Sequence, residues 1–450
     1  MKAVLGGKGA NLAEMTNLGV PVPPGFTIAC SECIAYLRDG KYSDRLRAEV
    51  EGNVARLEHV TGRKFGDPKN PLLVSVRSGA PVSMPGMMET ILNLGLNDRT
   101  AQGLATQSRN ARFAYDSYRR FVQMYADVVL GESSANFEHL LKARRLTTGA
   151  KTDADLSEDA LRNLVEEYKS LVRNATGQDF PTNPVVQLWG AIEAVWKSWT
   201  LKKARDYRKV NAIADDLGTG VNIVAMVFGN LGDDSGTGVA FTRDPSTGEK
   251  KFYGEFLINA QGEDVVAGIR TPLRIEEMAQ KLPGAYQDLL ATQQKLEQHF
   301  AEMQDLEFTV ERGKLFLLQT RTGKRTAAAA VRIATDMTLG RKAIERACGV
   351  TPQFFRAPHG FRSPWVNSIA HSLGERTIGW SLGVWDSDRP GADAIVKRTL
   401  DGTRAGSIVL LHDGDGYNAN GDRLQTAQAL PRIISGLQDR GFEFVTLPAQ

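Results

Sequence analysis

Apolar and polar positions alternate most clearly over residues 305–321 (DLEFTVERGKLFLLQTR), where they predict two β-strands joined by a tight turn. Successive side chains of a strand point to opposite faces of the sheet. Asp305 and Glu307 therefore share one face of the first strand, and Gln319 and Arg321 share one face of the second. The pattern predicts a β-hairpin that carries two acids, an amide and a guanidinium.

The loop length decides which of these residues face one another. A three-residue loop at 312–314, with its glycine near the left-handed region, places Glu307 opposite Gln319, whereas a two-residue loop places Leu318 opposite Glu307. Oxygen ligands on neighbouring strands beside a guanidinium suit a magnesium ion bridged to phosphates, because magnesium binds few carboxylates and completes its shell with water and phosphate oxygens. The alternative is a polar sheet face exposed to solvent.

Two glycine-containing segments upstream carry further cations. Residues 72–76 form a buried-type strand that ends at Arg77, and a loop containing Ser83 and Gly86 follows it. An arginine at a strand end beside such a loop is well placed to bind phosphate in a bidentate manner.

The other segment is LGGKGANLAEM at 5–15, which predicts a glycine turn leading into a helix with Lys8 at the turn. Glycines let backbone amides approach an anion, and the lysine adds a positive charge. An ordinary turn with a surface lysine is the alternative, because the string lacks the spacing of a P-loop.

The remaining pattern predicts helices and strands in alternating blocks. Residues 105–210 are helical, and Ser157 caps a helix whose apolar positions follow a period of 3.6. The later elements are expected as follows: a hairpin of residues 222–230 and 239–245, a strand at 251–259, a loop with buried aliphatic residues at 261–272, and an alanine-rich helix at 326–337.

Composition narrows the functional classes. The chain has 450 residues and a net charge of +3, with no dense Lys/Arg run, so nucleic acid is not expected as a partner. No apolar segment has the length of a signal peptide or a membrane span, so we expect a cytoplasmic protein that does not bind membranes.

Four strings resemble the ATP-grasp nucleotide-binding part of the pyruvate, phosphate dikinase family: LGGKGANLAEM, SVRSGAPVSMPGMMETILNLG, SGTGVAFTRDPSTGEKKFYGEFLINAQGEDVVAGIRTP and DLEFTVERGKLFLLQTRTGKRTAAAA. The resemblance spans residues 2–337 and implies an ATP-grasp fold that binds MgATP between two subdomains. It implies ATP-site roles for Lys8, Arg77, Ser83, Gly86, Asp305, Glu307, Gln319 and Arg321. Within this set it implies that Lys8, Arg77 and Arg321 act on the phosphates and that Glu307 and Gln319 bind Mg²⁺.

The resemblance is incomplete in ways that limit the expected chemistry. The family often has a second arginine where this chain has Pro81, and its phosphoryl-accepting histidine and its pyruvate-binding barrel are not recognisable among the 450 residues. The full dikinase cycle is therefore not expected to run within this chain, and a phosphoryl acceptor would act in trans.

Residues 338–450 show a different pattern, with strands and helices in βα order. The strings FRAPHG, WDSD and LLHDG resemble the C-terminal half of polysaccharide deacetylases. The resemblance implies that Arg356 orients a catalytic base, that Asp386 holds this arginine and that His412 is a general acid. The first half of that family and its HxxxH metal motif are missing, so we expect an inactive segment with an open parallel sheet of about four strands.

Together these patterns predict an α+β protein: an ATP-grasp fold with a helical insert, followed by a partial α/β barrel. The expected domains are residues 1–105, 106–210, 211–337 and 338–450. Three functions remain open: phosphoryl transfer from ATP, nucleotide binding without turnover, and carbohydrate deacetylation. The abrupt change of pattern near residue 338 also leaves open that two genes were joined by error.

Overall fold

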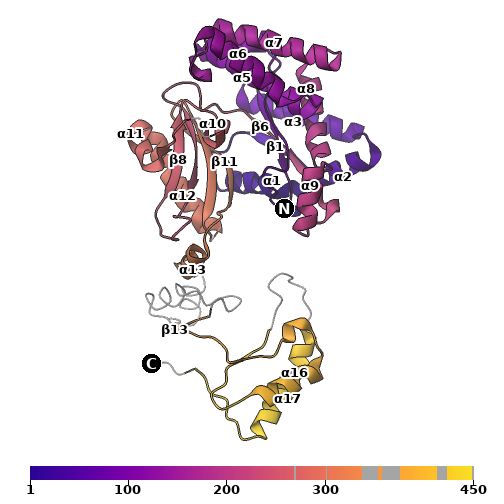
Figure 1. Ribbon diagram of the computed structural model, residues 1–450, viewed down its shortest axis with the longest axis vertical. Coiled ribbons are helices and arrows are strands. Elements are labelled where there is room, and N and C mark those ends of the chain that lie inside the picture. Colours follow the sequence, from indigo (N-terminus) through magenta and orange to yellow (C-terminus); the bar gives the residue numbers. More distant parts are fainter. Residues whose placement is uncertain (268–269, 301, 337–352, 357–375, 413–422, 448–450) are drawn as a thin grey trace. The chain divides into compact units, whose positions relative to one another are not determined.

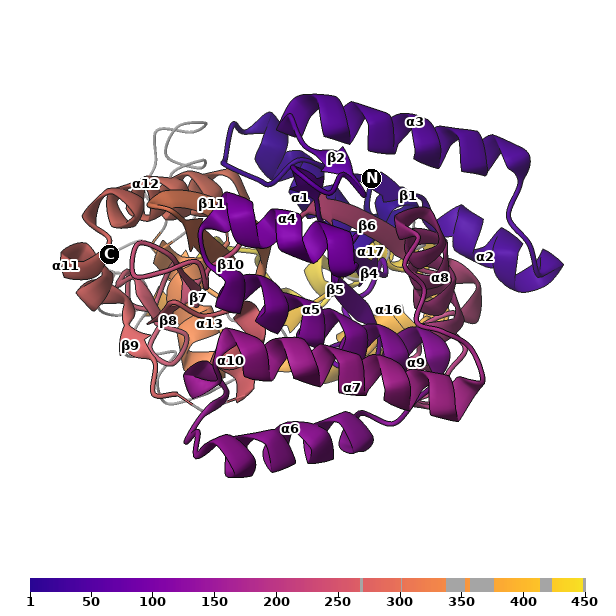
Figure 2. The same cartoon turned by 90° about the horizontal axis from the view of Figure 1, so that it is seen from above.

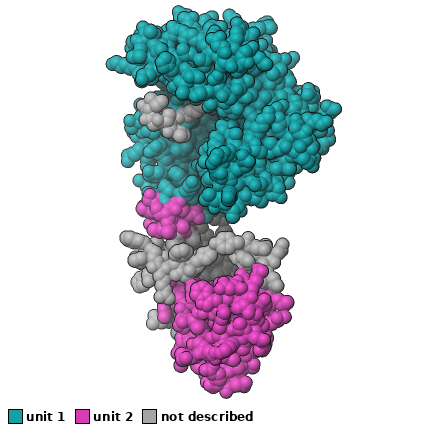
Figure 3. All heavy atoms as spheres, turned by 45° about the vertical axis from the view of Figure 1, so that its right-hand side comes forward, with its two compact units in different colours: residues 1–245, 250–324 teal, residues 246–249, 325–450 magenta. Residues whose placement is uncertain are grey.

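The structure is a computed structural model that describes residues 1–267, 270–300, 302–336, 353–356, 376–412 and 423–447. The chain divides into two compact units, which are described separately (Figure 3). Unit 1 comprises residues 1–245 and 250–324, and unit 2 comprises residues 246–249 and 325–450. The junction predicted near residue 338 lies outside the described residues. Mixed helix and sheet content confirms the expected α+β class.

The first sheet of unit 1 is antiparallel, with the strand order β1-β6-β4-β5. Its strands are β1 (Gly25–Ile28), β4 (Val74–Gly79), β5 (Thr90–Leu94) and β6 (Gly220–Ala225). A short parallel pair, β2 (Lys64–Phe65) and β3 (Pro71–Leu72), precedes β4. A strand was predicted at residues 72–76, and the structure has β4 here, which begins at Val74 and continues to Gly79. Arg77 therefore lies within the strand and not at its end, where it was predicted.

The helices of this region are α2 (Cys30–Asp39), α3 (Asp44–Thr61), α4 (Asp98–Ser108), α5 (Ala111–Tyr125), α6 (Ser134–Thr148), α7 (Glu158–Thr176), α8 (Pro184–Ser198) and α9 (Lys202–Val210). Of these, α2, α5 and α8 pack on the first sheet, and the other helices extend the same apolar core. Figure 2 shows α4, α5, α7 and α6 in successive layers, and Ser157 caps α7 as predicted by accepting a hydrogen bond from Ala160 N. The predicted helical segment at 105–210 is therefore confirmed.

The second sheet of unit 1 is also antiparallel, with the strand order β11-β10-β7-β8-β9. Figure 1 shows β8 and β11 of this sheet. Its strands are β7 (Gly236–Phe241), β8 (Tyr253–Ile258), β9 (Leu273–Arg274), β10 (Gln304–Glu311) and β11 (Lys314–Thr322). The helices of this region are α10 (Gly262–Ala267), α11 (Met278–Lys281) and α12 (Pro283–Phe300). A separate apolar core lies between this sheet and α11 and α12.

Helix α1 (Lys2–Asn17) contacts both sheets. Its Asn11 side chain donates a hydrogen bond to Thr320 O of β11 at 2.7 Å, and Met15 is buried in the core of the second sheet. The helix is kinked at Gly6, where φ is +71°. A Cβ atom at Gly6 would lie 1.4 Å from Gly79 O, so only glycine allows this close approach to the end of β4.

Two sequence predictions about unit 1 are wrong. Residues 222–230 and 239–245 do not form a hairpin, because β6 pairs with β1 and β4 while β7 pairs with β8 and β10. The segment at 261–272 is not entirely a loop, since α10 begins at Gly262. Neighbouring strands in the sequence belong to different sheets here, and that separation depends on long-range packing.

Unit 2 contains two separate pairs of parallel strands within its described residues. They are β12 (Phe354–Phe355) with β13 (Arg376–Thr377), and β14 (Leu382–Gly383) with β15 (Val409–Leu410). Helices α16 (Ala392–Gly402) and α17 (Leu424–Gln438) pack together over a small apolar core. Parallel pairing was expected, but the described strands do not form the single four-stranded sheet that was predicted.

Unit 2 also includes α13 (Ala327–Asp336), which corresponds to the predicted alanine-rich helix. Thr326 Oγ1 donates a hydrogen bond to Ser246 O at 2.7 Å, and a Cβ atom at Gly248 would lie 2.7 Å from Ala329 O. Residues 246–249 therefore pack on α13. Among the described residues, no helix has the length and apolar character needed to span a membrane.

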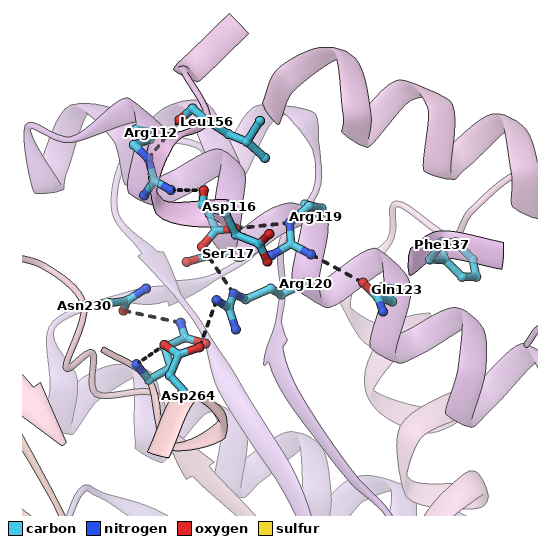
Figure 4. A network of polar contacts seen from close by, with 12 residues as sticks. Arg112, Asp116, Ser117, Arg119, Arg120, Gln123, Phe137, Leu156, Asn230 and Asp264 are labelled. Atoms are coloured by element: carbon cyan, nitrogen blue, oxygen red, sulfur yellow. Dashed lines mark hydrogen bonds and ion pairs between the residues drawn. The ribbon is translucent and has the colours of Figure 1, made fainter. Parts of the chain in front are cut away.

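A buried ionic network centres on Asp116 of α5 (Figure 4). Asp116 Oδ1 accepts hydrogen bonds from Arg119 Nη2 at 2.7 Å and Nε at 3.1 Å, and Asp116 Oδ2 accepts from Arg120 Nε at 3.2 Å. Burial raises the pKa of Asp116, but the charges of Arg119 and Arg120 outweigh this effect and hold the pKa at about 2. Both Asp116 and Arg119 are almost fully buried.

Replacing Asp116 by Ala is expected to lower the free energy of unfolding by about 3–5 kcal/mol, because it leaves the buried Arg119 charge without its carboxylate. Urea denaturation at neutral pH measures the change. Glu158→Gln, which breaks the exposed pair with Arg162, is the control and is expected to change stability by less than about 1 kcal/mol. An Asp116→Ala effect as small as that of the control would contradict this account.

Candidate functional site

The hairpin of β10 and β11 pairs its polar residues as the sequence predicts. Asp305 lies opposite Arg321, and Glu307 lies opposite Gln319. The opposite face of β10 carries Leu306, which is buried in the core of the second sheet. The alternation thus separates a core face from a polar face, because each strand exposes every second side chain to the same side.

Of the two loop lengths left open by the sequence, the structure has the shorter one, yet with the pairing expected for the longer one. The turn has two residues, Arg312 and Gly313, both with positive φ (48° and 76°), as a type I′ turn requires. A two-residue turn alone would place Leu318 opposite Glu307. A β-bulge between Glu307 and Phe308 instead leaves Leu318 as the extra residue, so that Gln319 faces Glu307.

Two side-chain contacts order the polar face. Arg321 Nε donates to Asp305 Oδ2 at 2.7 Å, and Gln319 Nε2 donates to Glu307 Oε1 at 3.1 Å. Asp305 is buried and Arg321 is partly exposed. Asp305 therefore positions the guanidinium, while Glu307 Oε2 and Gln319 Oε1 are left for other ligands.

A cavity of about 570 Å³ lies against this face, and we call it the glycine-loop cavity. Its lining brings together most of the predicted site residues, namely Lys8, Ser83, Gly86, Glu307, Gln319 and Arg321. Lys2, Asn11 and Lys324 also line it, and the sequence analysis did not identify them. Asp305 is not among its lining residues and acts through Arg321.

Like charges surround Lys8 in this cavity. Burial, together with the charges of Arg77 and Arg321, lowers the pKa of Lys8 to about 8, although Glu307 opposes the change. The fold thus holds several cations close together, an arrangement that an anionic ligand would stabilise.

A second cavity of about 570 Å³ shares Lys8, Thr90 and Glu307 with the first. We call it the Met226 cavity, after the segment that joins β6 to β7. Arg77 lines this cavity and not the first one. Most of its other walls are apolar, and they include Leu92, Met124, Met226, Val227, Val239, Val265 and Leu318.

The tip of the hairpin contacts the Met226 segment. Phe228 N donates to Glu311 Oε2 at 2.7 Å, and Gly313 N donates to Asp234 O at 2.8 Å. The hairpin therefore supplies the polar wall of the first cavity at one end and anchors a wall of the second at the other.

The family described as "Pyruvate phosphate dikinase, AMP/ATP-binding domain" matches residues 2–61, 42–285 and 276–341. The chain belongs to this family. A pyruvate, phosphate dikinase from Clostridium symbiosum is 53% identical over 339 residues, which are 75% of this chain and 39% of that protein. The Giardia intestinalis enzyme is 55% identical over 341 residues, again 75% of this chain and 39% of that protein. The chain thus spans about two fifths of the length of these relatives.

The residues that line the two cavities belong to unit 1 and lie within the range that the family matches. The walls of the Met226 cavity come from α1, β4, β5, α5, β7, α10, β10 and β11 and from the segments between β6 and β7 and between β8 and α10. Sequence reasoning missed most of these residues, because an isolated aliphatic side chain looks the same in a core and in a ligand pocket.

The donor set of Glu307 and Gln319 fits a hard cation such as Mg²⁺, which accepts one or two protein oxygens together with phosphate and water oxygens. Both residues line the glycine-loop cavity, and their mutual hydrogen bond orients them. The described residues contain no cluster of three or more His, Cys, Asp or Glu side chains placed to hold a metal.

The deacetylase-like residues of unit 2 are arranged differently from the expectation. Buried Asp386 accepts hydrogen bonds from His412 N at 2.8 Å and from Thr426 Oγ1 at 3.0 Å, and it contacts His412 Nδ1 at 2.9 Å. These contacts lower the pKa of Asp386, against the effect of burial. The structure shows no hydrogen bond or ion pair between the exposed Arg356 and Asp386, so Asp386 positions His412 and not the arginine.

Two solved structures are similar to a quarter of the chain. A CE4 family pseudoenzyme from Bacillus anthracis is 26% identical, with a TM-score of 0.22, and covers 25% of this chain and 36% of that chain. A family 4 carbohydrate esterase from Streptomyces lividans in complex with acetate is 27% identical, with a TM-score of 0.22, and covers 25% of this chain and 53% of that chain. TM-scores this low assign neither a fold nor a function to the chain.

Replacing Lys8 by Met is expected to raise the free energy of unfolding by about 1–2 kcal/mol at pH 7, because it removes a cation from a site where the pKa is lowered. Below pH 8 the lysine is charged in both the folded and the unfolded state, so the gain is constant. Between pH 8 and the ordinary pKa of 10.5 the folded wild type loses the charge first, so the gain shrinks. Urea denaturation at pH 7 and pH 10 measures both effects.

The control for this comparison is Lys2→Met, since Lys2 lies on the same helix but is exposed. It is expected to leave stability nearly unchanged at both pH values. A Lys8→Met variant that is less stable than the wild type at pH 7 would show that the lysine stabilises the free protein.

Proposed function

We propose that unit 1 binds MgATP and presents its terminal phosphate to an acceptor that acts in trans. The observation that carries this proposal is the convergence of Lys8, Arg321 and the Glu307–Gln319 pair on the glycine-loop cavity, next to a largely apolar cavity of equal volume. A site for ATP needs cations and a metal ion around the triphosphate, and it needs an apolar pocket for the nucleobase at its other end.

The phosphates would lie in the glycine-loop cavity. Arg321 is held by Asp305 in a fixed direction, and Lys8 adds a charge at the kinked start of α1. Phosphoryl transfer is mainly a matter of positioning and charge neutralisation, so residues of this kind supply most of what catalysis needs. Arg77 lines the Met226 cavity, so it would contact the phosphate groups from that cavity and not from the glycine-loop cavity.

Magnesium, when bound by Glu307 and Gln319, would neutralise charge on the phosphate oxygens. The protein's own part is to hold the Glu307 carboxylate and the Gln319 amide side by side, which the bulge at Leu318 achieves. Nucleotide binding without turnover remains the alternative. It differs from the proposal in the fate of the phosphate and not in the binding site.

Isothermal titration of the whole chain with ATP tests the proposal. One saturable site per chain is expected with Mg²⁺, and a weaker one without it. A folded sample that shows no saturable binding in the presence of Mg²⁺ would refute the proposed function. Incubation with γ-labelled ATP and a candidate histidine-containing acceptor protein then separates transfer from simple binding.

Replacing Glu307 by Gln is expected to weaken the Mg²⁺-dependent binding of ATP by about 10-fold or more, because it removes the proposed carboxylate ligand. Asp305→Asn, two residues away on the same strand, is the matched control. It is expected to cause a smaller loss that does not depend on Mg²⁺, since Asp305 acts through Arg321. Equal Mg²⁺-dependent losses in the two variants would argue against Glu307 as the metal ligand.

A chain shortened to residues 1–337 is expected to keep its affinity for MgATP within about twofold, because every proposed site residue precedes residue 325. This end point retains α13, on which residues 246–249 pack. The titration is compared with that of the whole chain after circular dichroism has shown that the shortened chain is folded. Loss of binding in a folded sample would show that residues 338–450 contribute to the site.

A further inference from the structure

We propose that Gln261 determines the base selectivity of the nucleotide site, with its Oε1 atom accepting a hydrogen bond from the exocyclic amino group of adenine. This inference rests on the proposed function, since it assumes that the base occupies the Met226 cavity. It adds a specificity-determining residue that the sequence pattern did not indicate.

The side chain of Gln261 lines the Met226 cavity and is only 6% exposed. Its Nε2 atom donates to Asn230 Oδ1 at 3.3 Å. Its Oε1 atom is buried and has no hydrogen-bond partner among the residues that the structure describes. A buried acceptor without a partner is unfavourable, so a ligand that donates a hydrogen bond at this point gains the interaction without breaking another one.

The polar network of α5 holds Gln261 in place. Gln261 N donates to Asp264 Oδ2 at 2.9 Å, and Asp264 Oδ1 accepts from Arg120 Nη2 at 3.1 Å. Arg120 is bound in turn to Asp116, as Figure 4 shows. The network therefore connects α5, beside the first sheet, to the start of α10, and it fixes the backbone from which the Gln261 side chain extends. A fixed donor or acceptor discriminates between ligands better than a mobile one does.

The surroundings of Gln261 leave few other ways to recognise a base edge. The hydroxyl groups of Thr237 and Thr309 lie 3.3 Å apart, and Thr237 also bonds to Phe308 O at 3.0 Å. Of the charged lining residues, Lys8 and Glu307 also line the glycine-loop cavity, where the phosphates are proposed to lie, and the charge of Arg77 acts on Lys8. The remaining lining side chains are mainly aliphatic or Met. They make van der Waals contacts with a flat apolar ring, but they do not form hydrogen bonds with the polar atoms at its edge.

The orientation of the Gln261 amide decides whether the site favours a base that donates a hydrogen bond or a base that accepts one. With Nε2 bound to Asn230, the Oε1 atom is presented as an acceptor. A half-turn of the amide would bring Oε1 against Asn230 Oδ1, so it requires Asn230 to turn as well. Adenine carries an amino donor at position 6, whereas hypoxanthine carries a carbonyl acceptor there. The two bases have nearly the same shape, but hypoxanthine also carries a hydrogen at N1. Unsubstituted purine keeps N1 as an acceptor and lacks only the amino group, so it isolates the effect of this one hydrogen bond.

The test is a titration of the whole chain with three magnesium nucleotides: ATP, inosine triphosphate, and purine riboside triphosphate, which has hydrogen at position 6. Wild-type protein is expected to bind ATP about 10- to 100-fold more tightly than either analogue. Gln261→Leu is expected to lower ATP affinity about 10-fold, to leave the affinity for purine riboside triphosphate nearly unchanged, and so to abolish most of the discrimination. A purely structural role of Gln261 would weaken all three nucleotides alike.

The matched control is Gln293→Leu, because Gln293 is a buried glutamine of α12 that lines neither cavity. It is expected to keep the wild-type ratio of ATP to inosine triphosphate affinity. Circular dichroism and urea denaturation show whether each variant is folded. If Gln261→Leu does not fold, the order of the three nucleotide affinities of the wild-type protein still tests the inference. An acceptor at Gln261 Oε1 requires ATP to bind most tightly of the three.

The outcomes separate this inference from the proposed function. Absence of ATP binding by folded wild-type protein would refute the proposed function. Equal binding of ATP and inosine triphosphate, or tighter binding of inosine triphosphate, would refute the role of Gln261 and leave the proposed function intact. A parallel loss of all three nucleotides in folded Gln261→Leu would refute it as well.

Discussion

The extra residue at Leu318 is the constraint on which the candidate site depends. In a strand, a shift of one residue exchanges the core face and the outer face for every side chain that follows. The type I′ turn at 312–313 fixes the pairing near the tip, and without a bulge it would direct Gln319 toward the core. The bulge restores the alternation that puts Gln319 beside Glu307. A local irregularity thus produces the oxygen pair proposed to hold the metal ion.

A second constraint comes from close backbone contact at the kink of α1. Gly6 lies so near Gly79 that no side chain fits, and Gly7 N donates to Ala80 O at 2.9 Å. Because α1 also bonds through Asn11 to β11, the helix fixes Lys8 with respect to both the glycine loop and the hairpin. The fold therefore holds Lys8 close to the cations Arg77 and Arg321. Burial and the charges of these cations lower the pKa of Lys8, and an anionic ligand would stabilise such a site.

Sequence alone predicted those parts of the fold that depend on short-range pattern. The two faces of the hairpin followed from alternation, and the cap at Ser157 followed from its hydroxyl and the apolar period after it. It failed where pairing depends on distant residues: β6 and β7, adjacent along the chain, join different sheets. The sequence left the loop length open and did not indicate the bulge. The predicted faces were right because the bulge compensates for the two-residue turn.

Gln261 is one of the residues that the pattern did not predict, and its proposed role depends on tertiary structure. Gln261 has no periodic neighbours that mark it. Its Oε1 atom is available as the proposed acceptor for the base because the Nε2 atom donates its hydrogen bond to Asn230. The pair of buried Asp116 and partly buried Arg120 supports this arrangement from another helix through Asp264. Such networks stabilise only when every member is satisfied, so they fix geometry strictly. The helical segment at 105–210 therefore does more than cover the first sheet: through Arg120 it positions the start of α10, and with it the wall of the proposed base pocket.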